Sequence, residues 1–506
     1  MARVTADPGA RPGNTAARPD LRIFASPWVW AVAAAQLAAL LATSTRYGYH
    51  RDEFYFVVAG WHPAFGYPDQ PPLVPLVCAA IGGGSLTVLR TPSALASVAT
   101  ALLAALIARE VGGDGRAQVI AAACTAVSAF ALAVGHFVTT TTFDLLSTTL
   151  LGWLVIRALR RRSAPLLLAA GIVVGAGFEA KPQVGLVAAV MTAAFAVIGP
   201  RWPLEQRWWT VAAACAAAGL AAPYLLWQQL HGWPQLTVAH NIAGSAENGR
   251  VGFIPFQLVM VSPLLIPVWV RGLVAPFRRA GWQELRFVPL TYAAIAVVYL
   301  LADGKAYYLA SLYPIVLGLG AIPTAERTLG SRRRTRTLAV AIALSGCISA
   351  FIALPLLPAG DLQGSIVMAL NPDQGETVGW PRFLQTVRLA WGHLPPAERA
   401  HTAIFTAIYG EAGAFDVLGG ADGLPRAYSG HNGFSEWGPP PRSATHALVV
   451  GFAGSRDAAP AFGRCRTLAV ERNGVGLDNQ EQDMPVLLCA VMRPWPRLWP
   501  GLTHFD

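Results

Sequence analysis

Residues 23–45 read IFASPWVWAVAAAQLAALLATST and contain no charged side chain. A bilayer core about 30 Å thick is crossed by a helix of about 20 apolar residues, so this stretch predicts a membrane-spanning helix. Ten further apolar runs follow it, at residues 92–108, 117–135, 141–159, 164–179, 183–199, 209–230, 256–276, 287–303, 306–325 and 337–357. The sequence therefore predicts an all-α membrane domain over residues 23–357 with about 11 transmembrane helices.

The composition agrees with a membrane protein. Of the 506 residues, 54% are apolar and only 13% are charged, whereas soluble domains carry about 25% charged residues. A net charge of +10 would favour nucleic-acid binding if the basic side chains gathered on one exposed face. They fall instead in short groups between apolar runs, so no nucleic-acid partner is expected, and the composition disfavours a compact soluble enzyme.

The basic residues also orient the chain. With the N-terminus inside, the loops on the cytoplasmic side hold 21 Lys and Arg up to residue 336, and the other side holds 6. Cytoplasmic loops carry the excess of basic residues, so we expect a multi-pass plasma-membrane protein with a cytoplasmic N-terminus. Residues 1–22, rich in Arg, Pro and Gly, are predicted to be a disordered cytoplasmic leader; a cleaved signal peptide is the alternative.

After eleven spans, residues 358–506 lie outside the cytoplasm. Apolar segments at 402–409 and 447–452 resemble buried strands, and 410–419 suits a helix between them. We therefore expect a small C-terminal α/β extracytoplasmic domain. Cys465 and Cys489 are the two cysteines of this part of the chain, and an oxidising compartment allows them to form a disulfide.

Candidate catalytic residues lie in the long first outer loop, residues 46–91. It opens with YGYHRDEFY at 47–55, which places Asp52 and Glu53 next to each other. Adjacent helical residues point about 100° apart, so one carboxylate is expected to face a cavity while the other is held by Arg51 or a backbone amide. A solvated loop salt bridge is the alternative.

Other polar loop residues are candidates for substrate contact. The same loop continues as WHPAFGYPDQPPL at 61–73, where repeated proline restricts the backbone and presents His62 and Gln70. His240 lies in a later polar loop, residues 231–252, which suits either substrate contact or a plain connector.

The chain has 36 Arg but only two Lys, Lys181 and Lys305, both at predicted outer helix ends. An ammonium group makes a compact point-charge contact with phosphate, whereas snorkelling at the membrane surface is the alternative. Tyr307 and Tyr308 add phenol donors beside Lys305.

Asp69 and Asp144, together with His136 or His62, have side chains of the types that bind divalent metals. Their spacing is not diagnostic, and Asp144 at a helix start is also favoured by the helix dipole. A divalent metal is therefore one option and is not required.

Taken in order, these motifs resemble bacterial family 39 glycosyltransferases. These are class C membrane glycosyltransferases (GT-C), related to protein O-mannosyltransferases and to lipid A aminoarabinose transferases. The matching features are the Asp-Glu pair after the first span, the bent loop ending in Pro-Pro-Leu, Lys-Pro at 181–182, and Lys-x-Tyr-Tyr at 305–308. The resemblance covers about residues 23–357, and YGEAG at 409–413 and AYSGHN at 427–432 also look like actinobacterial members.

The resemblance implies a polyprenyl-phosphate-linked sugar donor and transfer on the outer face of the membrane. By similarity Asp52 is the catalytic carboxylate, and Lys181 and Lys305, with Tyr307 or Tyr308, hold the donor phosphate. Asp69 and Asp144 look like metal-binding positions of the aminoarabinose transferases. In those relatives a basic residue precedes Pro-Pro, whereas this chain has Gln70, so one phosphate contact differs.

The sequence thus predicts a transferase that moves a hexosyl or pentosyl group to a hydroxyl of a protein, lipid or glycan. One displacement at the sugar would invert its anomeric centre. The alternative is a polytopic transporter for a polar or lipid-linked solute, which would favour ionisable residues near helix centres or inverted repeats. A membrane-embedded metal hydrolase would favour a motif such as His-Glu-x-x-His, which the sequence lacks.

Overall fold

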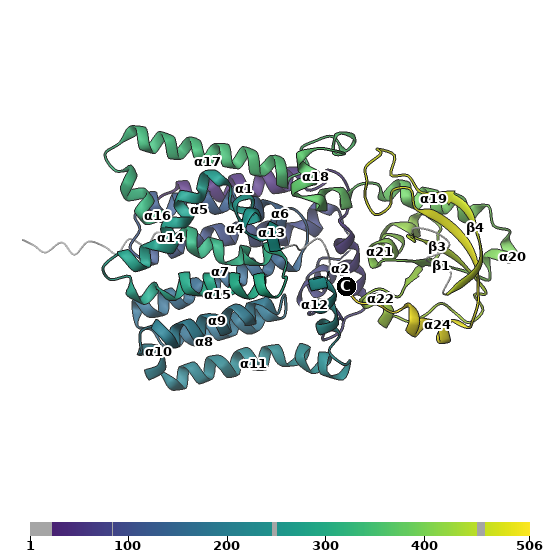
Figure 1. Cartoon of the computed structure of the whole chain (residues 1–506), viewed down its shortest axis with the longest axis horizontal. Helices are drawn as coiled ribbons and strands as arrows, with labels where there is room; N and C mark the ends of the chain where they lie inside the picture. Colours follow the sequence, from purple (N-terminus) through teal and green to yellow (C-terminus); the bar gives the residue numbers. More distant parts are fainter. Residues whose placement is uncertain (1–22, 83, 245–249, 453–460) are drawn as a thin grey trace, which may run out of the picture.

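The computed structural model describes residues 23–506 except residues 83, 245–249 and 453–460 (Figure 1). The leader predicted at residues 1–22 lies outside the described residues. A helical bundle forms one end of the molecule, and a smaller domain built around a β-sheet forms the other. The predicted all-α membrane domain with a C-terminal α/β domain is confirmed.

Each of the eleven apolar runs coincides with a helix or a broken helix. Among the described residues, six helical segments are long and apolar enough to cross a membrane, two helix pairs bent by 58° and 78° are broken candidates, and three apolar helices are shorter. The helices are α1 (Trp28–Thr43), α4 (Leu86–Glu110), α5 (Gly115–Ala126) with α6 (Ala129–His136), α7 (Thr140–Arg161), α8 (Pro165–Phe178), α9 (Gln183–Ile198), α11 (Arg207–Leu230), α13 (Arg250–Val261) with α14 (Ile266–Arg278), α15 (Phe287–Leu301), α16 (Tyr313–Thr328) and α17 (Arg332–Ala353). The number that cross the membrane stays a prediction.

The first outer loop holds two short helices, α2 (Arg51–Trp61) and α3 (Leu73–Ile81). A capping box fixes the start of α2, because the Asp52 backbone N–H donates to His50 Nδ1 at 3.2 Å and the His50 N–H donates to Glu53 Oε2 at 2.9 Å. Satisfying the free N–H groups in this way stabilises a helix start. It also gives Asp52 and Glu53 different directions, since they are neighbours on one helical turn.

A buried ion pair joins α2 to the bundle. Arg90 of α4 donates from Nη2 to Glu53 Oε2 at 2.7 Å and from Nε to Oε1 at 2.9 Å. Glu53 also accepts the Val138 backbone N–H at 2.9 Å, and Arg90 donates to the carbonyls of Ser44 and Gly48. Both charged side chains are fully enclosed. Of the two candidate catalytic acids, Glu53 is therefore the one held inside the protein, by Arg90 and a backbone amide and not by Arg51. A catalytic role for Glu53 stays a prediction.

The C-terminal sheet has five strands in the order β2-β1-β3-β5-β4. Strand β1 pairs in parallel with β2 and β3, and β5 pairs antiparallel with β3 and β4. The strands are β1 (Thr402–Thr406), β2 (Ala427–Ser429), β3 (His446–Val450), β4 (Phe462–Val470) and β5 (Pro485–Val491). Cys465 and Cys489 form a disulfide between β4 and β5.

Helices cover both faces of this sheet, which explains why β1 is buried along its whole length. The residues of α19 (Trp380–Gly392) and α21 (Tyr409–Leu418) pack with Ile404 and Leu448 on one face. Trp495 of α24 (Trp495–Leu502) packs with Phe405 and Val449 on the other. The strands and the helix expected near 402–452 are thus present.

The C-terminal domain sits directly on α2 (Figure 1). Three glycines make this close approach possible. A Cβ atom at Gly410 would lie 2.6 Å from Arg51 Cβ, one at Gly413 would lie 2.7 Å from Phe54 Cβ, and one at Gly433 would lie 2.6 Å from the Tyr55 hydroxyl. Real Cβ contacts are longer, so the packing of α21 and of α22 (Gly433–Glu436) on α2 requires glycine at these positions.

Replacing Glu53 with Gln should destabilise the protein strongly. The substitution leaves Arg90 buried without its counter-charge, and breaking a buried pair costs about 3–5 kcal/mol. The matched control is Glu326→Gln, which breaks the half-exposed pair with Arg279 and should cost less than about 1 kcal/mol. Thermal unfolding of the two variants in detergent measures the difference. Equal midpoints would contradict the anchoring role of Glu53.

Candidate functional site

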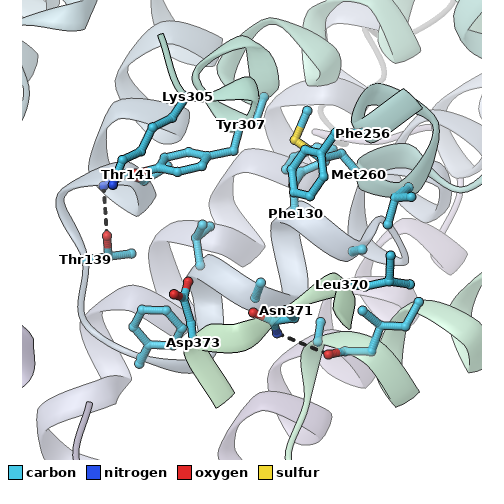
Figure 2. A pocket seen from close by; sticks show the side chains of 18 of the residues that line it. Phe130, Thr139, Thr141, Phe256, Met260, Lys305, Tyr307, Leu370, Asn371 and Asp373 are labelled. Atoms are coloured by element: carbon cyan, nitrogen blue, oxygen red, sulfur yellow. Dashed lines mark hydrogen bonds between the residues drawn. The ribbon is translucent and has the colours of Figure 1, made fainter. Parts of the chain in front are cut away.

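A cavity of about 220 Å³ lies where the helical bundle meets the C-terminal domain. Figure 2 shows Lys305, Tyr307 and Asp373 around its polar part. Asp52 lines the same cavity. An apolar part of the wall comes from α6, α13 and the end of α17, with Phe130, Ala133, Phe256, Val259, Met260 and Ile352. One cavity therefore joins charged groups to an apolar surface inside the bundle.

A second cavity of about 520 Å³ adjoins the first and is more polar. The two share Arg51, Lys305 and Asp373. Glu376 and Gln480 line only the second, and both belong to the segment after the bundle. Arg51, Lys305 and Asp373 thus stand between the two cavities.

Asp52 faces the cavity with a carboxylate that is held in place. Its Oδ1 accepts a hydrogen bond of 2.7 Å from the Tyr409 hydroxyl of α21, and its side chain is 31% exposed. Burial raises the pKa of Asp52, but the charges of His50 and Arg51 and the hydrogen bond from Tyr409 outweigh burial and lower the pKa below its ordinary value. Asp52 is therefore ionised at neutral pH.

The two lysines lie near each other, and the charge of Lys305 acts on Asp52. Lys305 lines the cavity, and Lys181 lies behind the cavity wall. Lys181 Nζ donates to Thr141 Oγ1 at 2.9 Å and is 5.4 Å and 4.6 Å from the ring centres of Tyr307 and Tyr308. Burial lowers the pKa of Lys181 to about 8; the charge of Asp144 opposes that shift and the charge of Lys305 adds to it. These contacts concentrate positive charge at one end of the cavity.

The expected metal-binding residues lie in three different surroundings. Asp69 accepts a 2.6 Å hydrogen bond from Tyr55, Asp144 accepts one of 3.2 Å from Thr148, and His136 lies 3.5 Å from Arg90 Nη1. Within the part of the chain that the structure describes, no three His, Cys, Asp or Glu side chains come together in a way that would hold a metal ion. The residues do not fit the expected metal, and we derive no step through one.

The remaining candidates lie away from the two cavities. His62 stacks on Trp437 with ring centres 4.6 Å apart. Gln70 is buried in the Pro-rich bend, and His240 is exposed on α12 (Pro234–Gly244). None of the three lines either cavity. Tyr308 packs against Tyr307 and Lys181 behind the cavity wall.

The sequence reasoning missed several residues at the cavity. Tyr409 reaches Asp52 from the C-terminal domain, and Arg51, Asn371 and Asp373 line the cavity. Asn371 is fixed by a 3.1 Å hydrogen bond from Nδ2 to the Ile352 carbonyl. The YGEAG motif at 409–413 was the signal that pointed to Tyr409, but the sequence alone gave no reason to place it beside Asp52.

Comparison with known proteins gives two consistent matches. Residues 69–227 match the family model described as dolichyl-phosphate-mannose-protein mannosyltransferase. The structure of ArnT from Cupriavidus metallidurans bound to undecaprenyl phosphate is similar to that of this chain, with a TM-score of 0.59 at 13% identity. The match covers 92% of this chain and 98% of ArnT. The chain has the fold of the class C membrane glycosyltransferases.

The resemblance to family 39 glycosyltransferases is therefore confirmed, and the chain is a multi-pass membrane protein of this fold. AglB from Archaeoglobus fulgidus, an oligosaccharyltransferase in complex with an inhibitory peptide and a dolichol-phosphate, matches at a TM-score of 0.48 and 14% identity, over 78% of this chain and 63% of AglB. No curated protein matches the chain. The family model covers Lys181 and Asp144 but neither Asp52 nor Lys305.

The lowered pKa of Lys181 can be measured directly because the chain has only two lysines. Reductive methylation with ¹³C-formaldehyde labels both lysine amines and the N-terminal amine, which ordinarily titrates at about 7.7–8.0. NMR in detergent follows each resonance, and the lysine resonances are identified by substitution. One resonance should titrate near pH 8, charged below that value and neutral above it, because burial disfavours the charged form. Lys181→Arg should remove this resonance and so assign it. A Lys181 resonance that titrates near the ordinary value of 10.5 would contradict the described surroundings.

Proposed function

We propose that the protein transfers a sugar from a polyprenyl-phosphate donor to an acceptor hydroxyl on the extracytoplasmic side of the membrane, with inversion at the anomeric carbon. The observation that carries the proposal is the single cavity shared by Asp52, Lys305 and an apolar wall. A lipid-linked phosphosugar needs these three features together, because it has an apolar chain, an anionic link and a reacting carbon next to that link.

The apolar wall suits the isoprenoid part of such a donor. Phe130, Phe256, Met260 and Ile352 lie on helices of the bundle and continue from the charged end of the cavity into the membrane domain. The ArnT structure with the same fold is bound to undecaprenyl phosphate, which supports a donor of this class. The phosphate would then lie at the Lys305 end.

Asp52 would act as the general base. As the acceptor oxygen forms its bond to the anomeric carbon, the acceptor proton moves to the Asp52 carboxylate, and the electron pair of the breaking carbon–oxygen bond goes to the polyprenyl phosphate. General-base catalysis of this type contributes about 10²- to 10⁴-fold to a rate. The lowered pKa keeps Asp52 in the carboxylate form that the step requires.

The positive groups would stabilise the departing phosphate. Lys305 and the Tyr307 side chain line the cavity, and Lys181 adds charge from behind Tyr307. Fixed donors and charges act strongly where negative charge develops in a site shielded from water. A bound phosphate would also favour the ammonium form of Lys181, so donor affinity should weaken as pH rises above about 8.

Replacing Asp52 with Asn should abolish most sugar transfer without releasing the donor. The variant cannot accept the acceptor proton, so we expect a loss of about 10²- to 10⁴-fold in rate. Transfer is measured by mass spectrometry in membranes supplied with polyprenyl-phosphate mannose and polyprenyl-phosphate arabinose. Asp361→Asn, an exposed acid outside both cavities, is the matched control. If Asp52→Asn still transfers sugar, Asp52 is not the base. If the variant keeps sugar transfer but loses transport of a solute across the membrane, the transporter function is favoured.

Replacing Tyr409 with Phe should raise the pH at which the rate of sugar transfer falls as the solution is made more acidic. The Tyr409 hydroxyl stabilises the charged form of Asp52, so its loss raises the pKa of Asp52. The base is then protonated at a higher pH, and the rate falls more at acidic pH than at neutral pH. The control is Tyr428→Phe, which changes a tyrosine of the same domain whose ring lies 4.8 Å from the Arg426 guanidinium; the pH dependence should then stay as in the wild type. If the pH–rate profile of Tyr409→Phe is the same as that of the wild type, this hydrogen bond does not set the pKa of Asp52.

A further inference from the structure

A third cavity forms a wide groove at the opposite end of the bundle from α2 and the C-terminal domain. Its volume is about 950 Å³, and it lies between the starts of α1, α5 and α17. Figure 1 shows α17 running along one edge of the bundle, with α1 and α5 beside it. The groove shares no residue with the two cavities around Asp52.

The groove lies where the first half of α17 packs only partly on the bundle: Leu338 and Ile342 contact the core but stay half-exposed. The buried residues of α17 are Ser345, Ser349 and Ala353, all in its second half. There the Ser262 hydroxyl donates a 2.8 Å hydrogen bond to Ser345 Oγ, which connects that half of α17 to the bundle. The first half leaves an apolar strip open, lined by Leu338 and Ile342 and faced by Ile120 of α5.

The mouth of the groove carries unbalanced positive charge. Arg116, Arg332 and Arg336 line it. Arg332 and Arg336 are four residues apart on one helix, so their charges lie on the same face and repel each other. Asp114 is the one acidic residue of the lining, and its Oδ1 accepts the Ala117 backbone N–H at 2.9 Å as a helix cap. An anion at the mouth would relieve this repulsion.

We infer that this groove binds an anionic phospholipid, with its phosphate at Arg116, Arg332 and Arg336 and an acyl chain along the strip between α5 and α17. Basic pockets between transmembrane helices are suited to anionic lipid headgroups, and the apolar strip favours a ligand with a hydrocarbon tail over free phosphate. Residues 1–22 are a poor occupant by charge, because they contain four Arg and two Asp and carry the same sign as the groove.

The test compares lipid binding to the full chain and to two double variants. The protein is purified in detergent and titrated with phosphatidylglycerol or with phosphatidylcholine of the same acyl chains, and native mass spectrometry measures the bound fraction. The wild type should prefer phosphatidylglycerol. Arg332→Gln with Arg336→Gln should reduce its affinity for phosphatidylglycerol by about tenfold or more, since each basic residue near a membrane surface contributes about 1 kcal/mol.

The matched control is Arg333→Gln with Arg334→Gln, which removes the same charge from the same helix outside the groove lining. This variant should keep the wild-type preference. Equal losses in both double variants would overturn the site, because a general charge effect would then account for the binding. Displacement of phosphatidylglycerol by millimolar inorganic phosphate would also overturn it, since the acyl chain would then contribute nothing. Thermal unfolding of both variants checks that they remain folded.

Discussion

The enclosed contact between Glu53 and Arg90 is the constraint on which the site depends. A buried charge without a partner is costly, so the pair holds α2 against α4 and against the link between α6 and α7. Because Asp52 precedes Glu53 on the same helical turn, fixing the Glu53 carboxylate inward leaves Asp52 pointing elsewhere. In this fold it points into the cavity at the domain boundary.

The rest of the site is assembled around that carboxylate from distant parts of the chain. The bundle supplies Lys305 and the apolar wall, and the C-terminal domain supplies Tyr409. Glycines at 410, 413 and 433 let that domain come close enough to α2 for the Tyr409 hydroxyl to reach Asp52. The C-terminal domain is therefore part of the site.

Much of the architecture could be predicted from the sequence because it depends on local composition. Uncharged runs such as residues 23–45 specify apolar helices, and the apolar segments at 402–409 and 447–452 specify buried strands. Asp52 and Lys305 were also predictable as residues of one site, since the family resemblance groups them. The sequence left undecided whether Cys465 and Cys489 are bonded to each other, and the structure contains this disulfide.

The surroundings of several site residues could not be predicted from the sequence, because they depend on the directions in which side chains point in three dimensions. Apart from the family resemblance, the residue pattern did not distinguish the enclosed Glu53 from the cavity-facing Asp52, because that choice depends on Arg90, which comes 37 residues later. The contact of Tyr409 with Asp52 spans 357 residues. Asp69 and His136 have the chemistry of metal ligands, but Tyr55 and Arg90 are the partners that tertiary packing gives them.

The most direct test of the account is an experimental structure of the protein with a bound polyprenyl phosphate. We expect the phosphate within hydrogen-bond distance of Lys305, the isoprenoid chain along Phe256 and Met260, and Asp52 across the cavity from the phosphate. A phosphate bound elsewhere, or a closed wall of helices between Lys305 and Asp52, would contradict the shared cavity from which the proposed chemistry is derived.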